Sequence, residues 1–296
     1  LYEGWGKVNK KVFHDFPSHH MAMHYCPWEM QKHVLNSAQF KVTEGEVDPK
    51  DVDADYVFDC RGKPDDYSNY EPLINPTNAC ILGKPNWDTS KAYWSRHVAT
   101  PDGWTFVIPT ALDSPSRSGG VGYCYNNNIT SKEDAEKNML EMFDVEVTKH
   151  INYDNYVSKE VVIDGRIILN GNRLFFLEPL ESSATESYIE VVRHFATCGV
   201  EKLNSYIPTY IKQLQNFVLW HYQFGSKYDT PFWNYVKKLT FSDYIFDSKL
   251  EKCMKSEWKD IFYDISTNND TRYGQWNNYA IKLWYDGMTN FSKKGN

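Results

Sequence analysis

The chain has 296 residues, 41% of them apolar and 16% aromatic, so it is long enough to bury a sizeable core. Its formal net charge is −7 and it has no basic cluster, which argues against a nucleic-acid partner because phosphate neutralisation needs grouped Lys and Arg. It shows neither a bilayer-spanning apolar run nor a signal peptide, and its six cysteines lack CxxC and zinc-ribbon spacing, so we expect a cytoplasmic protein with reduced thiols and no membrane contact.

The first half of the chain is predicted to be mainly β. Residues 55–62 are predicted to form a buried strand that ends in a turn. From residue 93 to 125 the pattern is again β, and its alternation places Trp104, Phe106 and Ile108 on one side and Thr105 and Val107 on the other.

Helices and a hairpin follow. Residues 130–133 are a capping box that begins a helix running to about Phe143. Asp164-Gly165 predicts a tight hairpin turn, because this pair readily supplies positive φ angles. Residues 185–195 have helical spacing of apolar positions. Beyond Val200 the chain is predicted to be helical, with one stripe formed by Ile211, Leu214, Phe217, Val218 and His221.

The run Leu177-Glu178-Pro179-Leu180-Glu181-Ser182-Ser183-Ala184 places two carboxylates and two hydroxyls at a predicted loop-to-helix junction. A helix start offers free backbone N–H groups and the positive end of the helix dipole, so it can hold a small anion or a flavin ring edge without a cationic side chain. Glu181 would lie beside that anion site, where a carboxylate is costly unless it has a function. The alternative is a carboxylate that only complements the helix dipole.

This run resembles the catalytic motif of the flavin-dependent halogenases, the family typified by tryptophan halogenases. Four other stretches agree with the family in the same order. Residues 103–109 are similar to its Trp-x-Trp-x-Ile-Pro signature, with Phe106 in place of the second tryptophan. The others are residues 55–62, residues 118–123, and His221-Tyr222 followed by residues 229–233.

The resemblance implies an α/β fold of the FAD-binding flavoprotein monooxygenase type, related to glutathione reductase, with a C-terminal helical substrate region. We expect a flavin-binding halogenase core over residues 1–200 and a helical substrate-covering region over residues 201–296. The family's catalytic lysine and a Gly-x-Gly-x-x-Gly fingerprint are not in the sequence. We therefore expect a longer protein with an N-terminal dinucleotide-binding part, and an intact mass equal to that of these 296 residues would contradict this.

The activity that the resemblance implies is electrophilic halogenation of an aromatic small molecule. Reduced FAD (FADH2) from a separate flavin reductase, dioxygen and chloride, bromide or iodide would give hypohalous acid. Glu181 would be the catalytic residue, and Ser182, Ser183 and Ala184 would bind the halide. Ala184 replaces a family glycine, which suggests a preference shifted towards bromide or iodide. The further expected residues are Trp104, Gly171, Leu180 and Thr185 for the cofactor and His14, Phe16, Phe106 and Trp284 for the substrate.

Simpler interpretations stay open beside these. Trp104 and Phe106 also fit a strand that faces a core, and Gly171 also fits an ordinary strand-to-loop turn. His14, His19, His20 and His24 lack the spacing of a metal site, so we expect no metal. The alternative functions are a flavin-dependent aromatic hydroxylase and a non-enzymatic aromatic-ligand-binding relative. A homo-oligomer is a further alternative.

Overall fold

A seven-stranded sheet is the largest sheet in the described part of the fold. The structure is a computed structural model. It describes residues 2–6, 11–12, 25–88, 95–109, 120–239, 272–277 and the four positions 280, 281, 284 and 288. His14 and Phe16 lie outside the described residues. The strand order is β2-β1-β6-β7-β8-β5-β9, and the neighbours are antiparallel except for β1 and β6. The bounds are Tyr2–Glu3 (β1), Lys11–Val12 (β2), Ala79–Pro85 (β5), Arg96–Thr100 (β6), Gly103–Ile108 (β7), Gly120–Tyr125 (β8) and Val145–Asn152 (β9).

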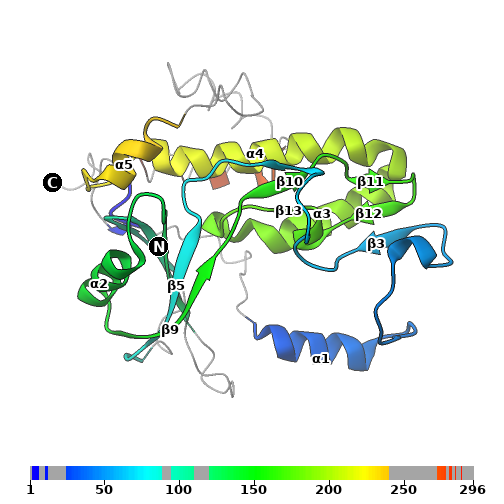
Figure 1. The fold of residues 1–296 in the computed structure, drawn as a ribbon, viewed down its shortest axis with the longest axis horizontal. Coiled ribbons are helices and arrows are strands. Elements are labelled where there is room, and N and C mark those ends of the chain that lie inside the picture. Colours follow the sequence, from blue (N-terminus) through cyan, green and yellow to red (C-terminus); the bar gives the residue numbers. More distant parts are fainter. Residues whose placement is uncertain are drawn as a thin grey trace.

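The two faces of this sheet belong to two separate cores. Trp104 and Phe106 face one core, and Val107 faces the other, which confirms the alternation predicted for β7. A Cβ on Gly122 of β8 would lie 2.0 Å from the ring of Phe106, so only glycine fits opposite that ring. Helix α2 (Lys132–Met142) covers the Val107 face through Ala135 and Met139 (Figure 1).

The predicted capping box at residues 130–133 is wrong by one residue. Ser131 is the N-cap, and its hydroxyl accepts a hydrogen bond from the backbone N–H of Asp134 at 3.1 Å. The hydroxyl of Thr130 instead donates to buried Asp102 at 3.1 Å, which holds this side chain at the residue before the cap. The predicted end near Phe143 agrees with the observed end at Met142.

Two three-stranded sheets and a short hairpin complete the β structure. The first sheet has the order β11-β12-β3, with β11 at Val162–Ile163, β12 at Ile167–Leu169 and β3 at Val57–Asp59. The second has the order β13-β10-β4, with β13 at Phe175–Phe176, β10 at Tyr156–Ser158 and β4 at Tyr70–Pro72, while β14 (Arg272–Tyr273) pairs with β15 (Trp276–Asn277). The strand predicted at 55–62 is thus shorter and only partly buried. The hairpin turn is confirmed, because Asp164 and Gly165 both have positive φ angles.

The helices of the second half cover the Trp104 face of the large sheet. Helix α3 spans Ser183–Cys198, α4 spans Leu203–Gln223 and α5 spans Pro231–Val236. All five residues of the stripe predicted on α4 are buried. Helix α3 is confirmed, but its buried residues are Ser183, Ser187 and Val191, while Ile189 and Val192 are exposed. Four single 3-10 turns lie at Pro49–Asp51, Gly171–Arg173, Leu180–Ser182 and Val200–Lys202.

Helix α1 (Pro27–Ser37) lies apart from the sheets in Figure 1 and buries none of its residues. Trp28 on this helix is 76% exposed. No helix within the described ranges has both the length and the apolar character that a membrane span requires.

Candidate active site

The loop before α3 has an unusual backbone. Glu181 and Ser182 adopt left-handed conformations, with φ angles of 67° and 52°, and α3 begins at Ser183. Such angles are unfavourable for residues with a Cβ and persist where the surroundings hold them. No side chain caps the start of α3. The missing side-chain cap is compatible with the anion site that the sequence predicts at this helix start, and that site stays a prediction.

The Glu181 carboxylate points away from these N–H groups and towards α4. Its Oε1 lies 3.1 Å from Nε2 of His221, and its Oε2 accepts a hydrogen bond from the indole N–H of Trp276 at 3.2 Å. The Glu181 side chain is 15% exposed, while that of His221 is fully buried. Glu181 therefore does not serve as a helix cap, and each of its two carboxyl oxygens has a named partner.

Rings from three parts of the chain surround this carboxylate. Trp284 lies 4.9 Å from His221 between ring centroids and is stacked on Trp220 at 5.5 Å. Phe217 lies 4.1 Å from Trp276 and 4.9 Å from His221. We call the set Phe217, Trp220, His221, Trp276 and Trp284 the aromatic cluster. Trp284, predicted as a substrate residue, thus belongs to the same cluster as the partners of Glu181.

The side chains predicted to bind the halide differ in burial. Ser183 is buried, and the hydroxyl of Ser187 donates to its carbonyl at 2.7 Å. Ser182, Ala184 and Thr185 are exposed, and Leu180 is fully buried beneath them. Ser182 and Thr185 thus present exposed hydroxyl donors at this helix start, whereas Ala184 can donate only through its backbone N–H.

A second carboxylate on the same loop lies in the core. Glu178 accepts hydrogen bonds from the backbone N–H and the hydroxyl of Thr77, at 3.0 Å and 2.6 Å, and a short one from the hydroxyl of Tyr222. Burial raises the pKa of Glu178 to about 7, although the bonds from Thr77 and Tyr222 act in the opposite direction. Glu178 and Glu181 thus contact the consecutive residues Tyr222 and His221 of α4.

Of the other predicted cofactor and substrate residues, Trp104 and Phe106 lie on β7, and Gly171 begins a 3-10 turn. Trp104 is 1% exposed and packs against His97, whose pKa burial holds at about 3, so this imidazole is neutral. Phe106 is only half-buried. Gly171 has a φ angle of 61°, and no protein atom lies within 4 Å of where its Cβ would be. Trp104 thus has the surroundings of a core residue, and its contact with a cofactor stays a prediction.

The sequence interpretation gave no role to the two partners of Glu181. His221 was noted as part of an apolar stripe, and a polar residue on such a stripe signals a buried group that needs a hydrogen-bond partner. For Trp276 no pattern in the sequence gives a comparable signal. No group of three or more metal-ligating side chains occurs in the described part of the chain, and the four N-terminal histidines considered above lie outside it.

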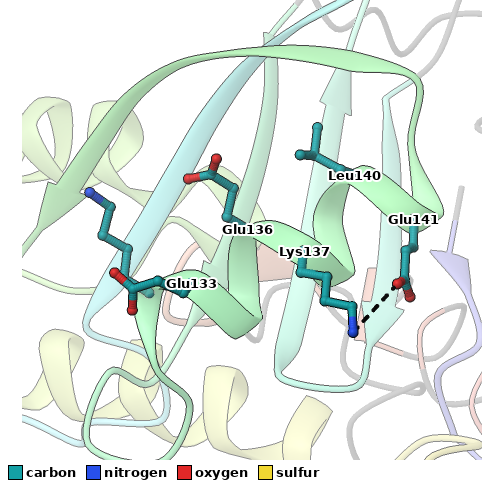
Figure 2. A pocket seen from close by; sticks show the side chains of 6 residues that line it. Glu133, Glu136, Lys137, Leu140 and Glu141 are labelled. Carbon is teal, nitrogen blue, oxygen red and sulfur yellow. Dashed lines mark ion pairs between the residues drawn. The ribbon is translucent and has the colours of Figure 1, made fainter.

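Cavities on the described surface include some that lie away from this site. One follows the charged outer face of α2, where Lys137 pairs with Glu141 (Figure 2). A second, of about 370 Å³, is lined by Asp59 and Arg61. A third lies between α3 and α4 beside Tyr206. The first is a solvated helix face, so its shape alone does not indicate a function.

Solved structures of halogenases share this architecture. MibH, described as a tryptophan 5-halogenase, superposes with a TM-score of 0.64 at 19% identity, covering 79% of this chain and 48% of MibH. Tar14, a tryptophan C-6 flavin-dependent halogenase, superposes with a TM-score of 0.60 at 17% identity, covering 80% and 50%. The fold is therefore the FAD-binding α/β fold of the flavin-dependent halogenases, as predicted.

Sequence comparison gives the family. The profile described as tryptophan halogenase matches residues 42–279, and the chain belongs to the tryptophan halogenase family. Tryptophan 7-halogenase RebH of Lentzea aerocolonigenes is 24% identical over 215 residues, which cover 64% of this chain and 39% of RebH. Tryptophan 7-halogenase KtzQ of Kutzneria sp. (strain 744) is 24% identical over 163 residues, covering 51% and 30%. The chain thus spans less than half the length of these two relatives.

Proposed function

We propose that this chain supplies the halogenating region of a flavin-dependent halogenase that acts on an aromatic small molecule. The observation that carries the proposal is the position of Glu181. Its left-handed backbone directs the carboxylate to the aromatic cluster, and the uncapped start of α3 follows two residues later. The proposed anion site at the start of α3 and the Glu181 carboxylate beside the aromatic rings therefore lie within one turn of the chain. Electrophilic halogenation of an aromatic ring needs both.

Reduced FAD from a separate reductase and a halide ion are the proposed cofactors. The open space beside Gly171 and the uncapped helix start fit such a group, and Trp104, Leu180 and Thr185 complete the proposed cofactor residues. The chemistry that reduced FAD supplies with dioxygen is oxidation of the halide to hypohalous acid. The sequence lacks a Gly-x-Gly-x-x-Gly fingerprint, so no residue is assigned to the diphosphate.

The residues of the chain itself then have two tasks. Ser182, Ser183 and Ala184 hold the halide, chiefly through the N–H groups of Ser183 and Ala184, because the N–H of Ser182 already donates to the Pro179 carbonyl at 3.0 Å. The positive end of the α3 dipole favours an anion there. Glu181 orients hypohalous acid by accepting its O–H, since each carboxylate oxygen keeps a free lone pair beside the bonds to His221 and Trp276. The family's catalytic lysine is not in the sequence and receives no role here.

The substrate would lie on the aromatic side of this turn. Trp284 and Phe106 are its proposed contacts, together with His14 and Phe16. The division into a core over residues 1–200 and a covering region over residues 201–296 belongs to the same proposal. Glu181 comes from the first part, and α4 and Trp284 come from the second.

Product analysis tests this function. The full-length protein is supplied with a flavin reductase, a panel of aromatic compounds and each halide in turn, and products are identified by mass spectrometry. We expect a halogenated product whose rate falls about 10²- to 10⁴-fold in Glu181→Gln, which is the usual effect of losing a positioned acid or base. Glu186→Gln, on the exposed side of α3 beside Arg193, is the control and should keep the rate.

Two results would contradict the proposal. Hydroxylated product in halide-free buffer would identify a monooxygenase instead. Failure of the reconstituted full-length protein to bind FAD would favour a non-enzymatic relative that binds aromatic ligands.

A further inference from the structure

His221 is a fully buried polar group beside the proposed catalytic carboxylate. Its side chain has no solvent exposure. Besides Phe217 and Trp284 of the aromatic cluster, Tyr2 stacks on its ring at 5.9 Å and Trp5 meets it edge-on at 5.9 Å. An imidazole in such apolar surroundings needs partners for both nitrogens, because an unsatisfied buried polar atom is costly.

The two partners of His221 fix the position of one proton. Nδ1 lies 2.8 Å from the carbonyl oxygen of Phe217, and a carbonyl can only accept, so Nδ1 carries a proton and donates it. Nε2 lies 3.1 Å from Oε1 of Glu181. If neither Nε2 nor Oε1 carried a proton, two lone pairs would face each other. One proton must therefore lie between His221 and Glu181.

Trp276 decides which carboxylate oxygen takes part. The indole N–H can only donate, and it lies 3.2 Å from Oε2 of Glu181. Oε2 is therefore an acceptor, and the shared proton belongs to the Oε1 side. The two contacts together specify the rotation of the carboxylate group, not only its location.

The same contacts act on the backbone of the turn. Glu181 and Ser182 have left-handed φ angles that residues with a Cβ rarely adopt, and α3 has no side-chain cap that would hold them. The bonds from His221 and Trp276 fasten the first of these residues to α4 and β15. Loss of both bonds would free Glu181 to relax towards an ordinary conformation.

We propose that His221 is a positioning residue, which orients the Glu181 carboxylate through a shared proton while Trp276 holds the other oxygen. This inference rests on the proposed function, in which Glu181 orients hypohalous acid. His221 itself need not touch the substrate or the halide. Its effect passes through Glu181.

A proton resonance tests the shared proton without any turnover. In ¹H NMR spectra of the ¹⁵N-histidine-labelled full-length protein, we expect a strongly downfield proton that correlates with a histidine ring nitrogen. This signal should disappear in His221→Gln and in Glu181→Gln. It should remain in His194→Gln, whose ring stacks on Tyr206 between α3 and α4, away from Glu181. It should also remain in Trp276→Phe, which removes only the indole N–H.

A double-mutant cycle tests the effect on halogenation. A misplacement of about 1 Å costs on the order of 10²-fold in rate, so His221→Gln should lower kcat by about that factor. In the Glu181→Gln background, the same substitution should change kcat less than about twofold, because residues that act as a unit are not additive. Equal unfolding midpoints of His221→Gln and His194→Gln would show that the loss is not a folding defect.

The outcomes separate the inference from the function on which it rests. Absence of the downfield proton, or full kcat in a folded His221→Gln protein, would overturn the role of His221. Additive losses in the cycle would overturn it as well. If no halogenation occurs with any halide, the proposed function fails, and the NMR experiment still decides whether the proton is shared.

Discussion

Two carboxylates three residues apart are held by two consecutive residues of one helix. Glu181 contacts His221 and Glu178 accepts from Tyr222. Consecutive side chains on an α-helix point about 100° apart, so α4 holds the loop from two directions. This arrangement explains how the left-handed conformation of Glu181 and Ser182 is maintained at the entrance to α3.

The residue Ala184 leads to a prediction about halide choice. It is the second residue of α3 and its methyl group is exposed at the helix start, beside the backbone N–H groups proposed to hold the halide. If the methyl group prevents close approach to the N–H groups, chloride loses more Coulomb attraction than bromide, because the smaller ion gains more from a short distance. In competition between equal concentrations of chloride and bromide, we expect the brominated product to dominate. Ala184→Gly should raise the chlorinated share several-fold.

A second glycine substitution controls for helix stability. Glycine weakens a helix by about 0.5–1 kcal/mol relative to alanine at any interior position. Ala196→Gly, an exposed position near the other end of α3, carries the same penalty without touching the helix start. Its product ratio should equal that of the unmodified protein. A dominant chlorinated product before any substitution would contradict the role given to Ala184.

At the scale of elements, the parts with strong local patterns are the ones that the sequence predicts. Alternation placed Trp104 and Phe106 of β7 on one face, and the Asp164-Gly165 pair placed the hairpin turn. The candidate site is less predictable from local patterns, because the partners of Glu181 lie 40 and 95 residues away along the chain. No local period encodes such contacts. The motif predicts the carboxylate, and only the packing of α4 and β15 reveals what holds it.

The start of α2 shows how a local prediction fails by one residue. Thr130 and Ser131 are both good N-cap residues, and Glu133 and Asp134 both suit the first turn, so the sequence permits two registers. The buried carboxylate of Asp102 decides between them by accepting from Thr130. Ser131→Ala should therefore lower the free energy of unfolding by about 1 kcal/mol in urea titrations.

The comparison variant for this cap lies on the same helix. Lys137→Ala removes an exposed ion pair with Glu141, visible in Figure 2, and should change the free energy of unfolding by less than about 0.5 kcal/mol. If Ser131→Ala changed the free energy of unfolding as little as Lys137→Ala does, Ser131 would not be the N-cap that stabilises α2.

At the scale of the whole molecule, the large sheet separates two cores, and Glu178 and Glu181 lie on the same side of it. The face towards α2 is filled by apolar and tyrosine side chains such as Ile81 and Tyr123. The face towards α4 also holds Glu178, which has no exposed surface. On the proposed catalytic side, the buried Glu178 therefore makes stability depend on pH.

The raised pKa of Glu178 determines the direction in which stability changes with pH. Burial raises its pKa from 4.5 to about 7, so between these values the folded protein holds a proton that the unfolded chain has released. The stabilisation from this proton is complete below about pH 4.5 and is lost as the pH rises through 7. The free energy of unfolding, taken relative to Glu178→Gln, should fall by on the order of 3 kcal/mol across that window.

Urea titrations of both proteins between pH 4.5 and 8 measure this difference, because the other titrating groups are common to both and cancel. Glu141→Gln, which changes an exposed carboxylate on α2, should give a difference that stays nearly constant with pH. A constant difference for Glu178→Gln would mean that Glu178 is ionised in the folded protein at all these pH values. The hydrogen bonds from Thr77 and Tyr222 would then outweigh burial, and the loop before α3 would rest on a buried charge.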